Sequence, residues 1–157
     1  MTLPPATRTA IAEAAAAHGG PKAAMLEALK LVQQAEGWVS DADLAEAAAT
    51  LGVTTAEIDS LATFYSQIFR SPVGETVILL CDGLSCYLCG ADAVRDAVMQ
   101  KLGIGFGETT PDGKFTLINI CCVGGCDRAP AALVGPDRTL VGPLSADELT
   151  ALIGGAP

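Results

Sequence analysis

Residues 76–86, TVILLCDGLSC, place two cysteines at the end of a continuous apolar run. The run Thr76–Leu80 lacks the alternation of a half-exposed strand, so it predicts a short strand buried on both faces. Beyond the cysteines, Ala91–Leu102 carries apolar residues at helical spacing and stops before Gly103. A buried strand followed by such a helix predicts the first part of a parallel strand–helix–strand crossover, with the cysteine loop between the strand and the helix.

The residues that follow predict the other strands of the same sheet. Phe115–Ile120 (FTLINI) predicts the second parallel strand, and Ala131–Val134 and Arg138–Val141 predict a hairpin. Ser145 with Glu148 forms a capping box that begins a terminal helix. The order strand, helix, strand, strand, strand, helix predicts the core of a thioredoxin-like fold, which packs a mixed sheet between helices.

The first 70 residues show only helical patterns. Apolar residues recur at helical spacing in four stretches: Ala10–Ala17, Lys22–Gln34, Leu44–Leu51 and Ile58–Tyr65. Two capping boxes, Ser40 with Asp43 and Thr54 with Glu57, begin the last two of them. This part of the chain therefore predicts a small helical bundle.

A break in the pattern separates two predicted domains. Ser71-Pro72-Val73-Gly74 interrupts the helical periodicity, and all six cysteines come after it. The sequence therefore predicts an α+β protein. Its helical bundle covers residues 1–72, and its thioredoxin-like α/β domain covers residues 73–157.

The charge and hydropathy of the chain exclude some classes of partner. The 157 residues carry a formal net charge of −9, which disfavours binding to a phosphate backbone. No run approaches the roughly 18 apolar residues of a membrane span, and the N-terminal residues lack the pattern of a secretory signal. We expect no nucleic-acid partner, no direct membrane insertion and a cytoplasmic protein.

The cysteines fall into two groups that the predicted fold brings together. Cys81 and Cys86 follow the first strand, and Cys121, Cys122 and Cys126 follow the second. Because the carboxyl ends of neighbouring parallel strands open on one edge of a sheet, both loops are expected at the same ligand-binding edge. Glycines in these loops leave room for backbone close to a bound group: Gly83, Gly124 and Gly125.

Three uses of the thiols compete. A zinc site needs two short knuckles, which Cys86-x2-Cys89 and Cys122-x3-Cys126 supply. A dithiol oxidoreductase needs C-x-x-C at the start of the crossover helix, which Cys86 and Cys89 supply. The dithiol interpretation leaves the four other cysteines unexplained.

An iron-sulfur cluster accounts for most of the cysteines and is the leading interpretation. The spacing Cys81-x4-Cys86 is a wide loop that suits a 2Fe-2S rhomb. The run Cys81-x4-Cys86-x2-Cys89 also matches the plant-type ferredoxin spacing, which would make Cys89 a ligand. Spacing alone leaves that choice open.

Several motifs in the same order resemble one known family. They are ALKLVQQAEGWVSD, ATFYSQIFRSPVG, CDGLSC, GETTPDGKFTL and CCVGGCDRAP. In these the chain is similar to the small thioredoxin-like 2Fe-2S subunit of the NADH-oxidising module of respiratory complex I, whose relatives serve in NAD-linked formate dehydrogenases and bidirectional hydrogenases. The resemblance covers nearly the whole chain.

The resemblance implies a ligand set. The family pattern of C-x4-C, about 35 residues and C-x3-C falls on Cys81, Cys86, Cys122 and Cys126. Two further cysteines lie outside it, Cys89 and Cys121, and we expect them to be small buried side chains. Pro130 stands where thioredoxin-like folds often have a cis-proline.

The resemblance also implies a function. The chain would carry one electron on a 2Fe-2S cluster near the flavin of a partner subunit, and that partner would bind FMN and NADH. The chain would act as an enzyme only as part of the complex, an NADH:quinone oxidoreductase. The chain would be cytoplasmic and peripheral to the cytoplasmic membrane through the assembled complex. Consistent with this, the sequence has neither a G-x-G-x-x-G motif nor a P-loop of its own. The alternatives are the equivalent subunit of a formate dehydrogenase or hydrogenase, and a dithiol oxidoreductase using Cys86 and Cys89.

Other conspicuous residues have ordinary structural interpretations. His18 is expected on the surface, and Trp38 in the core. The aromatic residues Phe64, Tyr65 and Phe69 are expected in the core of the helical bundle; the alternative is that part of this cluster faces the flavin subunit.

Overall fold

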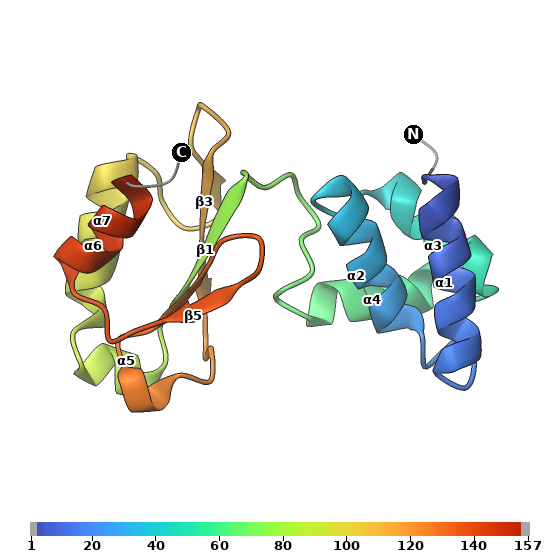
Figure 1. Ribbon diagram of the computed structural model, residues 1–157, viewed down its shortest axis with the longest axis horizontal. Helices are drawn as coiled ribbons and strands as arrows, with labels where there is room; N and C mark the ends of the chain where they lie inside the picture. Colours follow the sequence, from blue (N-terminus) through green and yellow to red (C-terminus); the bar gives the residue numbers. More distant parts are fainter. Residues whose placement is uncertain (1–2, 155–157) are drawn as a thin grey trace. The chain divides into compact units, whose positions relative to one another are not determined.

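The computed structural model describes residues 3–154 (Figure 1). The chain divides into two compact units, Met1–Pro72 and Val73–Pro157, and each is described by itself. The first unit is helical, and the second is built on a five-stranded sheet. Within the described residues, no helix combines the length and the apolar character needed to cross a membrane.

The described residues of the first unit, 3–72, form four helices. They are α1 (Pro5–Ala17), α2 (Met25–Glu36), α3 (Asp41–Leu51) and α4 (Thr55–Phe64). α1 begins five residues earlier than predicted, because a proline is well suited to the first helical position. α2 begins three residues later than predicted, since residues 21–24 form turns after Gly20, whose φ is 136°.

Local signals set the ends of these helices. The capping boxes of Ser40 with Asp43 and of Thr54 with Glu57 are both formed, so the two predicted starts are confirmed. Gly37 and Gly52 end α2 and α3 in the left-handed conformation, with φ of 81° and 72°, which a glycine adopts without strain.

The helical unit has an aliphatic core. Its fully buried side chains include Ile11, Leu29, Val32, Val39 and Ile58. Trp38 is only half-buried, and His18 is exposed as expected.

The placement of two aromatic residues in this core was wrong. Phe69 is buried, but Phe64 is 78% exposed and Tyr65 is 40% exposed. α4 ends at Phe64, and the backbone of Tyr65, its C-cap, is extended, so both residues lie at the end of the helix. Their rings contact each other edge to face, with centroids 5.2 Å apart.

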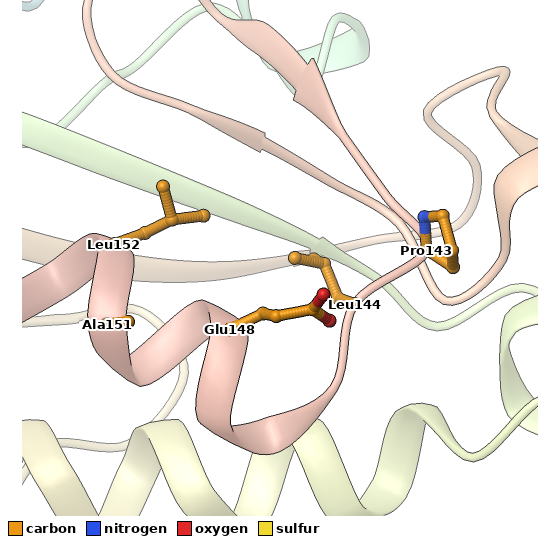
Figure 2. A pocket seen from close by; sticks show the side chains of 5 residues that line it. All are labelled: Pro143, Leu144, Glu148, Ala151 and Leu152. Atoms are coloured by element: carbon orange, nitrogen blue, oxygen red, sulfur yellow. The ribbon is translucent and has the colours of Figure 1, made fainter.

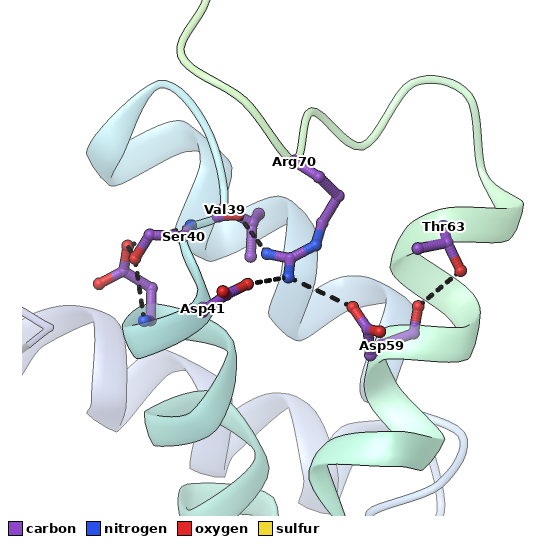
Figure 3. A network of polar contacts seen from close by, with 7 residues as sticks. Val39, Ser40, Asp41, Asp59, Thr63 and Arg70 are labelled. Carbon is purple, nitrogen blue, oxygen red and sulfur yellow. Dashed lines mark hydrogen bonds and ion pairs between the residues drawn. The ribbon is translucent and has the colours of Figure 1, made fainter.

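Arg70 fastens the end of the helical unit to the loop between α2 and α3 (Figure 3). Its guanidinium donates to the carbonyl of Val39 and, at 2.5 Å, to Oδ1 of Asp41, and it lies 3.3 Å from Oδ1 of Asp59 on α4. The neighbouring Phe69 carbonyl accepts from the Val39 N–H at 2.8 Å. One side chain thus joins three separate segments.

Replacing Arg70 with alanine is expected to lower the free energy of unfolding of the helical unit by about 1–3 kcal/mol. The reason is that Oδ1 of Asp59 is buried and has no hydrogen-bond partner among the described residues, so the guanidinium is the charge that compensates it. Native-state hydrogen exchange of α2 and α4 amides measures this change.

Arg95→Ala is the matched control, because Arg95 also contacts two carboxylates, Asp92 and Asp96, but both lie on its own helix. These are ion pairs at the surface, where water screens the charges, so the change should leave the stability of the chain almost unaltered. Equal losses in the two variants would contradict the role assigned to Arg70.

The described part of the second unit contains the five-stranded sheet, three α-helices and a short 3-10 helix. Its elements are β1 (Thr76–Cys81), α5 (Leu84–Leu88), α6 (Ala91–Leu102), β2 (Glu108–Thr109), β3 (Phe115–Ile120), a 3-10 helix η1 (Cys126–Arg128), β4 (Ala132–Val134), β5 (Thr139–Val141) and α7 (Ala146–Gly154). The sheet order is β2-β3-β1-β4-β5, with β1 parallel to β3 and antiparallel to β4. The predicted crossover, hairpin and terminal helix are confirmed, and so is the thioredoxin-like class.

The central strand β1 is buried along nearly its whole length, as its continuous apolar run predicts. Ile78 and Leu80 pack in one core with residues of α6 and α7, such as Val98 and Leu149. The two helices lie against each other beside the sheet (Figure 1). This packing fixes β1, and therefore the position at which the first cysteine loop leaves it.

Candidate metal centre

The four predicted ligand residues lie at one edge of the sheet. Cys81 is the last residue of β1, not the first residue after it, and Cys86 lies in α5. Cys122 follows β3, and Cys126 begins η1. Because Cys81 is the register partner of Ile120 in the parallel pair, both cysteine loops begin at the same level of the sheet.

Backbone hydrogen bonds fasten the first loop to its neighbours. The N–H of Asp82 donates to the Ile120 carbonyl at 3.0 Å, and the N–H of Cys81 donates to the Ala131 carbonyl at 3.1 Å. A side-chain bond adds to these, from Nδ2 of Asn119 to Oδ2 of Asp82 at 3.0 Å. The loop after β1 is thus held by β3 on one side and by the segment before β4 on the other.

The second pair of thiols is close enough to share one metal ion. The Sγ atoms of Cys122 and Cys126 are 4.0 Å apart. Two thiolates bound tetrahedrally at about 2.3 Å from one ion lie roughly 3.8 Å from each other. The N–H of Gly124 points to Sγ of Cys122 at 3.3 Å, as expected for a donor that stabilises negative charge on sulfur.

The first pair of thiols is buried. Cys81 and Cys86 are 2% and 1% exposed, whereas Cys122 and Cys126 are exposed. Burial, and next a hydrogen bond with the Cys81 thiol, raise the pKa of the Cys86 thiol to about 11. Cys86 is therefore protonated at neutral pH, and a metal that binds it must displace that proton, since the thiolate is the ligand.

The paired arrangement fits a 2Fe-2S cluster. In such a cluster each iron takes two protein ligands, so the donors come as two pairs. The chain supplies one buried pair and one pair with a 4.0 Å sulfur separation, on loops held at the same edge of the sheet. Within residues 3–154, no three Cys, His, Asp or Glu side chains gather around one point as ligands of a single ion.

The expected burial of the other two cysteines was wrong. Cys89 and Cys121 are both exposed. α5 ends at Leu88, and Cys89 caps it outside the core.

A thioredoxin-type dithiol needs an accessible nucleophile of lowered pKa. Cys86 is instead buried and its pKa is raised, so its environment disfavours a dithiol site of Cys86 and Cys89.

The sequence did not reveal an apolar surface beside the site. Leu84, Tyr87 and Leu88 are 74%, 57% and 74% exposed, and all three lie in the short helix α5 that also carries Cys86. The available signal was three large apolar residues within five positions of a loop. Exposed apolar groups at this density are typical of a surface that another protein covers.

A hollow elsewhere in the second unit has no cysteine among its lining residues. Pro143, Leu144, Glu148, Ala151 and Leu152 line about 550 Å³ beside α7 (Figure 2). Glu148 is the one titratable residue among them, and its carboxylate accepts from the N–H of Ser145 at 2.8 Å. That bond and the Ser145 hydroxyl hold the pKa of Glu148 below its usual value, so the side chain acts as a helix cap.

Comparison with known proteins agrees with this geometry. A family model described as thioredoxin-like [2Fe-2S] ferredoxin matches residues 11–156. An NADH-quinone oxidoreductase subunit of Pseudomonas aeruginosa is 47% identical over 117 residues, which are 74% of this chain and 70% of the relative. The corresponding NADH-quinone oxidoreductase subunit of Escherichia coli K12 is 43% identical over 135 residues, 86% of this chain and 81% of the relative.

A solved structure shows the same fold. The crystal structure of an NAD+-reducing [NiFe]-hydrogenase in the H2-reduced state superimposes with a TM-score of 0.70 at 27% identity. The match covers 85% of this chain and 22% of that chain, so this chain spans only about a fifth of its length.

Proposed function

Because the chain belongs to the thioredoxin-like [2Fe-2S] ferredoxin family, we propose that it is a one-electron carrier of an NADH-quinone oxidoreductase, in the role of its relatives from Pseudomonas aeruginosa and Escherichia coli. The match to this family confirms two predictions made from the motifs, the family itself and its 2Fe-2S cofactor. The observation that carries the proposal is the convergence of two cysteine loops at the end of the parallel pair β1 and β3.

The proposed ligands are Cys81 and Cys86 from the first loop, and Cys122 and Cys126 from the second. When bound, a 2Fe-2S cluster would supply a centre that gains and loses one electron. The buried thiols of Cys81 and Cys86 exclude water from one side of the site. The Gly124 N–H and the carboxylate of Asp82 act in opposite senses, since a donor to sulfur favours added negative charge and a carboxylate disfavours it.

The two units have separate roles in this proposal. Residues 73–157 form the cluster-binding domain, and residues 1–72 form a helical domain that holds none of the proposed ligands. The apolar side chains of Leu84, Tyr87 and Leu88 support a partner that covers α5, beside Cys86. We propose the flavin- and NADH-binding subunit as that partner, and a place on the cytoplasmic side of the membrane through the assembled complex.

Low-temperature EPR of the anaerobically purified chain, before and after reduction with dithionite, tests the proposal. We expect a silent oxidised state and a one-electron signal on reduction, with iron and sulfide in equal amounts. Zinc or free thiols in place of iron, and no signal, would contradict it.

A second candidate is the equivalent component of an NAD-linked hydrogenase. The observation in its favour is the TM-score of 0.70 with the hydrogenase chain. The identity of 27% with that chain, against 43% and 47% with the two NADH-quinone oxidoreductase relatives, favours the quinone oxidoreductase. Identification of the larger protein that co-purifies with the chain separates the two.

A further inference from the structure

Gly83 lies in the first cysteine loop at a point where no side chain fits. Its backbone has φ −63° and ψ 158°, an extended conformation that any residue adopts. A Cβ on Gly83 would lie 2.5 Å from the carbonyl oxygen of Cys121 and 3.5 Å from Sγ of Cys81. A carbon and an oxygen that are not bonded do not approach to 2.5 Å, so the requirement for glycine here is steric and not conformational.

Moving the Cys121 carbonyl oxygen away from Gly83 would disturb the adjacent sheet pairing. The Cys121 carbonyl follows directly on Ile120, which is paired with Cys81 in the sheet and accepts the Asp82 N–H at 3.0 Å. The Cys81 thiol also points at this carbonyl, at 3.8 Å. A methyl group at Gly83 would therefore push on the peptide that joins Cys121 to Cys122.

Gly83 also stands at a helix position where a residue other than glycine would be favoured. Gly83 is the N-cap of α5 and offers no side-chain cap, whereas Ser40 and Thr54 cap α3 and α4. A serine at an N-cap accepts a hydrogen bond from a backbone N–H of the first turn, which a glycine cannot do. Local helix chemistry thus favours serine at this position, and the contact with Cys121 excludes it.

We propose that Gly83 is a positioning residue for the cysteines: its missing Cβ lets the Cys81–Cys86 loop and the Cys121–Cys126 loop approach closely enough to hold one cluster. This inference rests on the ligand set proposed above. Gly83 touches no reacting atom in it and acts only through the Cys121 peptide.

The test compares Gly83→Ala and Gly83→Ser with Gly74→Ala in the full chain. Gly74 is the matched control, because its added Cβ would also meet backbone, at 2.9 Å from the Gly113 oxygen and the Phe115 nitrogen. It precedes β1, whereas Gly83 follows it, and the six residues of β1 at about 3.3 Å each separate the two positions by roughly 20 Å. Each variant is reconstituted with ferrous iron and sulfide, and its loss of iron to a chelator is timed.

Both Gly83 variants are expected to lose iron on the order of tenfold faster than wild type, as is typical when a residue that supports metal ligands is changed. Gly74→Ala should lower the melting temperature of the metal-free chain without this acceleration. The EPR line shape of the remaining cluster should change in the Gly83 variants only.

The opposite results are equally clear. Iron loss at the wild-type rate in Gly83→Ala, or a Gly83→Ser chain that is more stable and keeps its cluster, overturns the inference. So does an acceleration in Gly74→Ala that equals that of the Gly83 variants, because the effect would then be one of general stability. A wild-type chain that holds no cluster overturns the proposed function itself, and with it this inference.

Discussion

Cys86→Ser and Cys122→Ser are each expected to lower the iron and sulfide retained per chain on the order of tenfold or more. A serine hydroxyl is far harder to deprotonate than a thiol and is a poorer ligand for iron, so each change removes one of two donors from its pair. Both cysteines have a neighbouring cysteine outside the proposed ligand set, Cys89 and Cys121 respectively. Iron and sulfide analysis of the reconstituted chains measures the loss.

Cys89→Ser and Cys121→Ser are the matched controls, and both should retain the wild-type content of iron and sulfide. Their side chains are exposed, so the substitution disturbs no core packing. A loss in Cys89→Ser as large as that in Cys86→Ser would instead assign three ligands to the first loop, as in the plant-type spacing.

Leu88→Asp is expected to weaken association with the proposed partner, the flavin-binding subunit, about 100-fold, which corresponds to about 2.7 kcal/mol. Leu88 is 74% exposed on α5, so an aspartate costs little in the isolated chain. In a complex that covers α5, the same carboxylate would be desolvated among apolar groups, and that is costly. Titration of the purified partner subunit by calorimetry measures the change.

Leu152→Asp is the control for this variant, because Leu152 is also an exposed leucine of the second unit but lies on α7, beside the hollow of Figure 2. It should leave the affinity unchanged. The EPR signal of the isolated Leu88→Asp chain should match wild type, which would show that Cys86, two residues away, is undisturbed. Wild-type affinity in Leu88→Asp, or an equal loss in Leu152→Asp, would place the docking surface elsewhere.

The elements predicted correctly have local signals, either a long apolar pattern or, for the three-residue strands β4 and β5, the turn Gly135-Pro136-Asp137 between them. β1 is a six-residue apolar strand, and α6 repeats its apolar residues over three turns, so the crossover between parallel strands followed from the sequence. α5 and β2 span five and two residues, too few to show a period, and neither was predicted. β2 exists because the chain returns to pair with β3.

Some features of the candidate site could be predicted from the sequence, and others could not. The meeting of the two cysteine loops could be predicted, because the topology of parallel strands alone places them at one edge. The exposure of Cys89, Cys121 and Phe64 could not, because burial depends on which segments pack against a side chain. The contact between Gly83 and the Cys121 carbonyl joins residues on different loops, so only the folded chain reveals it.

The parallel pairing of β1 with β3 also bears on the entropy of the unfolded chain. Cys86 and Cys122 are separated by 35 residues of sequence, yet the sheet brings their loops together. A group bound by both thiols would close a loop that the unfolded chain otherwise leaves open, and a cross-link of this length restricts that chain by about 4 kcal/mol. Because the folded sheet already holds the two ends in place, the restriction falls almost wholly on the unfolded state. With the proposed ligands, cofactor retention and resistance to unfolding would therefore be coupled properties of this domain.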